Sequence, residues 1–144
     1  MVLQLFIGGI IIGITVLFQA IAFDVIIKRS RWLEARLNTR RSMWKAFFLT
    51  VIILAVICVL IVEIWIWALF YLAVDALPDL ETALYFSVST FTTVGFGDVV
   101  LSKEWRIIGS VEATNGFLLF GWSAAFIFEI VSTVYRREGR DLQR

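Results

Sequence analysis

The chain has 144 residues, of which 60% are hydrophobic and 17% are charged, and its mean hydropathy is +0.90. Soluble domains are about 45–50% apolar, so one of this length could not bury so many apolar side chains. The lack of His and the single Cys58 exclude histidine catalysis, histidine metal sites and an internal disulfide. We therefore interpret the chain as an all-α membrane protein, and its net charge of +1 gives no indication of nucleic-acid binding.

The first apolar segment covers residues 1–27 and carries one charged side chain, Asp24. A membrane helix needs about 20 apolar residues, so this segment predicts a transmembrane helix. It lacks the basic start and the small-residue cleavage site of a signal peptide. Gly9 and Gly13 form a GxxxG pattern, which either allows close helix packing or reflects the abundance of Gly in membrane helices.

A basic linker follows at residues 28–45, with Glu34 as its only acid. Its basic residues are Lys28, Arg29, Arg31, Arg36, Arg40, Arg41 and Lys45. Trp32, Leu33 and Leu37 share one helical face, so residues 30–39 would form an interfacial helix whose arginines contact anionic lipid headgroups. The alternative is a solvated basic loop.

Two further apolar segments are each long enough to span the membrane. Residues 46–74 contain Glu63 as their only charge, and residues 107–135 contain Glu112 and Glu129. We therefore expect three transmembrane helices, with the N-terminal one at the rim of the assembly.

Between these segments, residues 78–92 are too short to cross the membrane. Pro78 is favoured in the first turn of a helix, and the acids Asp79 and Glu81 suit the positive end of the helix dipole. A Gly-rich stretch at residues 95–97 follows. A short helix followed by irregular backbone indicates a re-entrant segment, buried in protein or facing a water-filled cavity.

The distribution of charge predicts the topology. A short tail at residues 136–144 is basic like the linker, with Arg136, Arg137, Arg140 and Arg144. The positive-inside rule places both segments in the cytoplasm, with the N-terminus and residues 75–106 outside. We expect a multi-pass protein of the cell membrane, specifically a bacterial inner membrane.

Residues 92–98, Thr-Thr-Val-Gly-Phe-Gly-Asp, carry the chemistry. Rings of backbone carbonyls can replace the hydration shell of an ion. Aiming successive carbonyls at one axis requires positive φ at some residues, which explains Gly95 and Gly97. Thr93 would add a ring of hydroxyls at the inner end. One chain supplies one such strand, so a symmetric oligomer is implied.

This stretch resembles the potassium-channel signature, with Phe96 in place of the commoner Tyr. Residues 85–91 resemble the pore helix of simple bacterial potassium channels, and Trp105 matches the start of their inner helix. The resemblance covers residues 46–137 and implies a homotetramer. It implies a pore domain at residues 46–135, with an outer helix at 46–74, a pore helix at 78–92, a filter at 93–98 and an inner helix at 107–135.

The resemblance also implies roles for individual residues, with K+ as the permeant ion and no cofactor. Carbonyls that bind K+ would come from Thr93, Val94, Gly95 and Phe96, and Gly97 would complete the filter. The filter would be stabilised by Asp98, Thr92, Ser89, Tyr85 and Glu112. Candidate gating residues are Gly116, Gly121, Phe120 and Glu129.

The chain departs from the family pattern around the filter. Tyr85 and Phe86 stand where many members carry Trp, and Phe96 has no hydroxyl group. Ser89 stands where some bacterial members place a Glu that pairs with the filter Asp. Asp98 then needs another partner, either Tyr85 or water, and we expect a less tightly held filter.

Acids within a membrane span are costly and therefore candidates for function, and three of them, Glu63, Glu112 and Glu129, lie in the second and third spans. We expect Glu112 to hydrogen-bond the back of the pore helix near Ser87 or Thr90 rather than to contact ions. Glu129 would surround the cytoplasmic entrance or pair with an arginine, and Glu63 would pack between spans or pair with a polar group.

Gating candidates on the third span each have a structural alternative. Gly116 and Gly121 would act as hinges or would allow close packing. Phe120, Phe126 and Phe128 would form a hydrophobic constriction or would face lipid.

We expect a potassium-selective channel, and the alternative is a weakly selective monovalent cation channel. A potassium-transporter subunit would carry four pore-loop repeats in one chain, and a non-conducting accessory subunit would not require the filter glycines. An enzyme is not expected, because the sequence offers no nucleophile–base pair and no metal-binding constellation.

Overall fold

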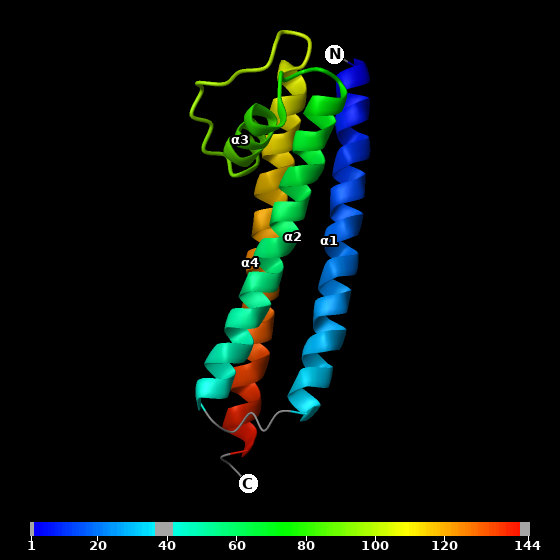
Figure 1. Ribbon diagram of the computed structural model, residues 1–144. Coiled ribbons are helices and arrows are strands. Elements are labelled where there is room, and N and C mark those ends of the chain that lie inside the picture. The colour runs from blue at the N-terminus through cyan, green and yellow to red at the C-terminus, as the bar shows by residue number, and fades with distance from the viewer. Residues whose placement is uncertain (1, 37–41, 142–144) are drawn as a thin grey trace.

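The computed structural model describes residues 2–36 and 42–141, and within these ranges the chain is helical without strands (Figure 1). The helices are α1 (Val2–Arg36), α2 (Ser42–Ala73), α3 (Leu80–Phe91) and α4 (Arg106–Asp141). Three of them contain apolar stretches that can cross a membrane, Val2–Ser30, Met43–Ala73 and Arg106–Arg136. The expected all-α architecture of three spans and one short helix is confirmed.

The arrangement in Figure 1 separates the short helix from the N-terminal span. The three long helices run side by side. Helix α3 and the loop after it lie at the end of the bundle that holds the N-terminus, on the side away from α1. This places α1 away from residues 92–98.

Helix α1 is longer than the first span expected from hydropathy. It continues to Arg36, so the first part of the expected interfacial helix at residues 30–39 is not a separate element. No Gly or Pro interrupts residues 28–36, and Lys, Arg, Leu, Glu and Ala are good helix formers. An ion pair one turn apart, with Lys28 Nζ 2.6 Å from Asp24 Oδ2, stabilises the same stretch. Residues 37–41 lie outside the described residues.

The other long helices also extend past their apolar segments. Helix α2 begins at Ser42 rather than at residue 46, and α4 continues to Asp141 rather than ending at residue 135. Most of the expected tail is therefore helical. Hydropathy marks the hydrocarbon boundary, whereas a helix continues as long as its residues favour helical backbone.

Helix α1 packs closely against α4. A Cβ atom on Gly8 would lie 2.8 Å from Val111 Cγ1, which shows how near the two backbones approach. One turn deeper, Asn115 Nδ2 donates a hydrogen bond to Thr15 Oγ1 at 2.9 Å, and both side chains are buried. Small residues and interhelical hydrogen bonds are the usual means of helix association in membranes.

Two further contacts continue this interface toward the opposite end. Gln19 Nε2 donates to the Leu119 carbonyl at 3.2 Å, and the rings of Phe23 and Phe126 stack with centroids 4.0 Å apart. Helix α1 is therefore an integral part of the bundle.

The GxxxG pattern of α1 makes no close contact within the described chain. Ideal Cβ atoms at Gly9 and Gly13 would meet no atom within 4 Å, whereas Gly8 is the glycine at the α1–α4 contact. The structure of one chain therefore does not support the interpretation that Gly9 and Gly13 allow close helix packing.

Side chains from α2, α3 and α4 form the most buried part of the core. The largest of these fully buried apolar side chains are Trp67, Tyr71, Phe91, Ile108 and Leu119. Many other large apolar side chains are exposed on the outer faces of the helices, as suits surfaces that meet lipid or other subunits.

Candidate functional site

Helix α3 begins about one turn before the side chains that face the loop at residues 93–98. Asp79 is its N-cap, with extended backbone (φ −154°), and its Oδ1 accepts a hydrogen bond from the Thr82 N–H at 2.8 Å. The helix therefore starts at Leu80 and not at Pro78. The carboxylates of Asp79 and Glu81 lie at the positive end of the helix dipole.

The far end of α3 reaches deep into the bundle. The Phe91 carbonyl group packs against Gly116, where an added Cβ would lie 2.8 Å from the carbonyl carbon. Gly116 is ten residues after Arg106, the start of α4, which corresponds to about 15 Å of helix. This is about half of the roughly 30 Å hydrocarbon thickness. The short helix is thus re-entrant, and its C-terminus lies near mid-depth.

The loop after α3 alternates the sign of its backbone φ angles. Positive φ values occur at Thr93 (60°), Gly95 (57°) and Gly97 (82°), whereas φ is not positive at Val94 and Phe96 between them. In an extended strand successive carbonyls point to opposite sides. Alternation of the sign of φ can turn them to a common side, which is the geometry that a ring of ion-coordinating carbonyls requires.

Thr93 is the unusual member of this set. Sequence reasoning explained positive φ at the two glycines and missed it at Thr93, where a left-handed conformation costs roughly 1–2 kcal/mol. The alternating register of the glycines, counted back by two residues, is the signal that could have identified Thr93.

One face of α3 holds the loop in place. Tyr85 and Ser89, one turn apart, both face it. Ser89 Oγ accepts a hydrogen bond from the Phe96 N–H at 3.2 Å. The Tyr85 hydroxyl donates to Asp98 Oδ2 at 2.8 Å, and its ring is nearly parallel to the Phe96 ring, with centroids 6.3 Å apart. Of the two partners expected for Asp98 from the sequence, Tyr85 or water, the structure shows Tyr85.

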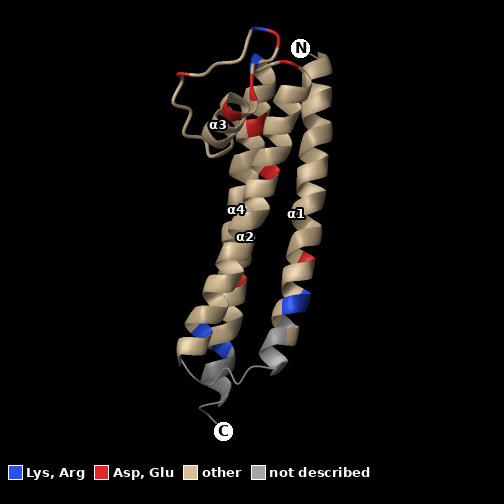
Figure 2. Ribbon diagram, viewed as in Figure 1, with Lys and Arg blue, Asp and Glu red and all other residues tan. Residues whose placement is uncertain are grey.

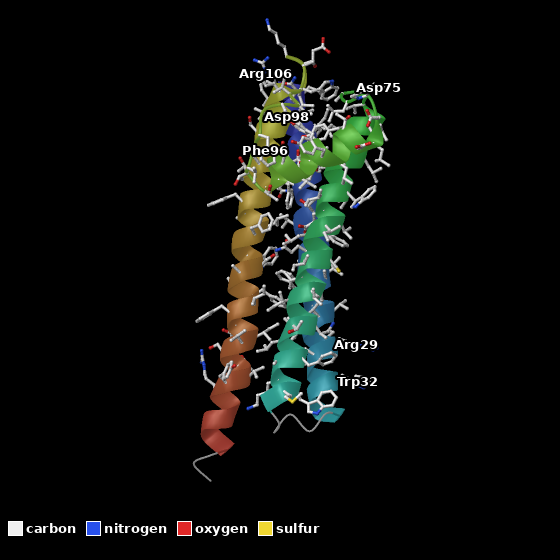
Figure 3. The ribbon with its side chains drawn as sticks, turned by 60° about the vertical axis from the view of Figure 1, so that its left-hand side comes forward. Arg29, Trp32, Asp75, Phe96, Asp98 and Arg106 are labelled. Carbon is white, nitrogen blue, oxygen red and sulfur yellow. The ribbon has the colours of Figure 1, made fainter. Side chains whose placement is uncertain are left out.

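These contacts change the acidity of the two exposed groups. The hydrogen bond from Tyr85 holds the pKa of Asp98 below its usual range, and the same bond raises the pKa of the Tyr85 phenol. Asp98 is therefore an ionised acceptor and Tyr85 a protonated donor at neutral pH. Figure 3 shows Phe96 and Asp98 toward the end of the bundle that carries Asp75 and Arg106.

Thr92 does not contact the loop through its hydroxyl group. Its Oγ1 donates back to the Val88 carbonyl at 2.6 Å, and Thr92 is the C-cap of α3. It thus satisfies the end of the short helix rather than the backbone of residues 93–98.

Glu112 lies behind α3, fully buried. Its Oε1 is 2.5 Å from Ser87 Oγ on α3, and its Oε2 is 2.7 Å from the Tyr71 hydroxyl on α2. The contact with Ser87 is the one expected from the sequence. Glu112 therefore connects α4 to both neighbouring helices.

The candidate gating residues fall into different environments. Gly116 is in close contact with Phe91, which matches its packing alternative, and the Phe120 ring lies 5.8 Å from the Phe91 ring. Gly121 has no atom within 4 Å of an added Cβ. Phe128 is 71% exposed.

The other acids make few contacts. Glu129 is exposed and accepts a hydrogen bond from Thr133 at 3.3 Å. It has no ion pair with any described side chain, so pairing with an arginine is not observed in that part of the chain. Glu63 is fully buried, and neither of its oxygens has a hydrogen-bond partner among the described residues.

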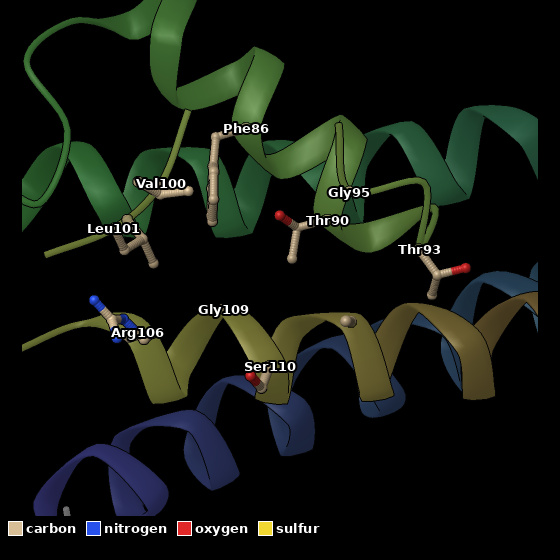
Figure 4. Close-up of a pocket in the computed structure, with 10 residues that line it drawn as sticks. Phe86, Thr90, Thr93, Gly95, Val100, Leu101, Arg106, Gly109 and Ser110 are labelled. Atoms are coloured by element: carbon tan, nitrogen blue, oxygen red, sulfur yellow. The ribbon is translucent and has the colours of Figure 1, made fainter. Parts of the chain in front are cut away.

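A pocket of about 440 Å³ lies between α3, the loop and α4 (Figure 4). Phe86 and Thr90 line it from α3, Thr93 from the loop, and Arg106 and Gly109 from α4. Its walls are mostly apolar, and it is open at the surface of the single chain.

Comparison with known proteins identifies the family of the chain. No curated protein and no solved structure matches it. A family model described as "Ion channel" matches residues 57–133, which is more than half of the sequence. The match includes about half of α2, all of α3 with its loop, and most of α4. The chain therefore belongs to the ion channel family and is a multi-pass membrane protein rather than an enzyme.

Proposed function

We propose that this chain is the subunit of a potassium-selective channel that conducts K+ passively. In this proposal dehydrated K+ is coordinated by the carbonyls of residues 93–96 and by the Thr93 hydroxyl, and Gly97 completes the filter. The observation that carries the proposal is the alternation of positive φ at Thr93, Gly95 and Gly97, because it turns successive carbonyls to one side.

The position of α3 supports conduction of a cation. Its C-terminus lies near mid-depth, where the negative end of a helix dipole favours positive charge. Tyr85, Ser89 and Asp98 then act on the filter from behind, through the Phe96 N–H and the outer carboxylate.

A homotetramer is the assembly that we propose. A ring of carbonyls requires several copies of the loop, and channels of this family generally assemble as multimers. Val94 and Phe96 are 56% and 69% exposed in the single chain, and the apolar pocket beside them is open. Both features suit surfaces that neighbouring subunits cover.

We propose an orientation with the N-terminus outside and the C-terminus in the cytoplasm. Figure 2 shows most acidic residues, together with some basic ones, at the end of the bundle that holds α3, whereas the opposite end carries mainly basic residues. There the Arg29 guanidinium lies 5.1 Å above the Trp32 ring (Figure 3). A basic side chain beside an indole suits a membrane surface with anionic lipid headgroups.

Reversal potentials of the purified protein in liposomes test the proposal. With K+ on one side and Na+ on the other, we expect a potential close to the K+ equilibrium value. Equal permeability would support the second candidate, a weakly selective monovalent cation channel, which the exposed and hydroxyl-free Phe96 favours. Gly95→Ala, assembled to the same oligomeric state, is the control for leak through the preparation.

A further inference from the structure

Glu112 takes part in a chain of hydrogen bonds that joins three helices. Tyr71 Oη lies 2.7 Å from Glu112 Oε2, and Glu112 Oε1 lies 2.5 Å from Ser87 Oγ. Ser87 Oγ in turn lies 3.0 Å from the Ile64 carbonyl oxygen. All four groups lie in the interior between α2, α3 and α4.

Counting the hydrogen atoms in this series of hydrogen bonds shows that it needs one more donor than an ionised Glu112 allows. Ser87 carries one hydroxyl hydrogen, yet it lies within hydrogen-bond distance of two acceptors, Glu112 Oε1 and the Ile64 carbonyl. If Glu112 is ionised, Ser87 can serve only one of them. If Glu112 is protonated, its Oε1–H donates to Ser87, Ser87 donates to Ile64, and the Tyr71 hydroxyl donates to Oε2. Only the protonated form makes all three contacts hydrogen bonds.

The surroundings of Glu112 lead to the same protonation state. Its side chain is fully buried, and no described Lys or Arg side chain is buried with it. A buried carboxylate without a cation is strongly disfavoured, and such a group is instead neutral.

We propose that Glu112 is a neutral carboxylic acid that donates a hydrogen bond to Ser87 and so holds the back of the pore helix against α2 and α4. Glu112 is then a positioning residue, since it acts on the filter only through α3. The opposite face of α3 carries Tyr85 and Ser89, which contact the filter. The inference concerns a proton and is independent of the ion selectivity proposed above.

Infrared spectroscopy of the reconstituted full-length protein tests the proposal. Subtracting the spectrum of Glu112→Gln from that of the wild type should reveal the C=O stretching band of a protonated carboxylic acid, sensitive to deuterium exchange. Ser87→Ala should shift this band to higher frequency, because the acid loses its acceptor. Carboxylate bands in place of the acid band would overturn the proposal.

Glu63→Gln is the matched control, since Glu63 is a buried acid on α2 without a hydrogen-bond partner among the described residues. If the Glu63→Gln difference spectrum reveals an acid band of Glu63, Ser87→Ala should leave that band unchanged. If Glu112→Gln does not assemble, the shift caused by Ser87→Ala alone decides the question, and no shift overturns the proposal.

A flux measurement tests the positioning role separately. The amide of Glu112→Gln can accept from Tyr71 and donate to Ser87, so its flux should stay within about twofold of wild type. Glu112→Leu cannot make either bond and should lose most of its flux. Normal flux in Glu112→Leu, or loss of flux in assembled Glu112→Gln, would contradict this role.

Discussion

The backbone carbonyl of Phe91 packs directly on Gly116, so that an added Cβ at Gly116 would overlap the carbonyl oxygen. Phe91 is the last residue of α3, and Gly116 lies ten residues into α4. This contact sets how far α3 enters the membrane. A glycine considered as a hinge from the sequence thus lies at a contact between two helices.

Gly116→Ala should therefore destabilise the protein by about 1–3 kcal/mol, because backbone atoms cannot move aside as a side-chain end can. The measurement is the midpoint of thermal unfolding in detergent, together with the oligomeric state. Gly121→Ala is the control on the same helix, with no atom within 4 Å of the new methyl group. Equal midpoints for the two variants would contradict the packing role.

Tyr85→Phe should shorten the time for which the channel conducts. The variant keeps the ring beside Phe96 but loses the hydrogen bond to Asp98, which holds the outer end of the loop. Single-channel recordings measure the open times. Thr82→Val, on the same helix but away from the loop, is the comparison, and identical open times for Tyr85→Phe and wild type would exclude the role.

Conduction should also depend, through Asp98, on the pH at the end of the bundle that carries α3. Its pKa is lowered, mainly by the hydrogen bond from Tyr85, so the interaction is complete above the usual pKa of an aspartate. It is lost as the pH falls through the lowered pKa. Tyr85→Phe lacks this interaction at every pH, so its current should not decline over the pH range in which the wild-type current declines.

The control for this pH dependence is Asp79→Asn, which keeps a side chain that can cap α3 but cannot titrate. Current–pH curves should coincide for Asp79→Asn and the wild type. A curve for Tyr85→Phe that declines over the same pH range as the wild type would contradict the assignment.

The buried contact between Thr15 and Asn115 should couple α1 to α4. Thr15→Val and Asn115→Leu remove the hydrogen bond at similar volume, and a double-mutant cycle isolates its energy. Hydrogen bonds between membrane helices average about 0.6 kcal/mol in such cycles, with maxima near 1.7. Unfolding in mixed micelles measures the coupling, and strictly additive effects would show that the contact contributes nothing.

Gly95→Ala should abolish K+ flux without preventing folding. Ala at φ +57° costs roughly 1–2 kcal/mol per chain, and no neighbouring atom lies within 4 Å of the added Cβ. Relaxing this φ turns the carbonyl away from its neighbours. Gly9→Ala, which adds the same methyl group in open space on α1, should conduct normally. Flux in assembled Gly95→Ala equal to that of wild type would refute the carbonyl geometry.

Local patterns were sufficient for much of the architecture. Hydropathy located the three spans because a membrane helix satisfies its own backbone and needs only length and apolarity. The re-entrant helix followed from its short length, its N-terminal acids and the glycines at 95 and 97. The prediction of helix ends was less accurate. The charged residues after Ile27 and Tyr135 end the apolar segments, but they are good helix formers, so the helices continue.

The sequence by itself thus determined the spans, the pore loop and the conformational need for Gly95 and Gly97, because these depend on residue type and on neighbours in the chain. Only the tertiary structure decided which side chains meet across helices. Ser89 contacts the Phe96 N–H, Asn115 contacts Thr15, and Glu112 joins α2 to α3. Such contacts depend on the rotation and depth of each packed helix, which no local pattern specifies.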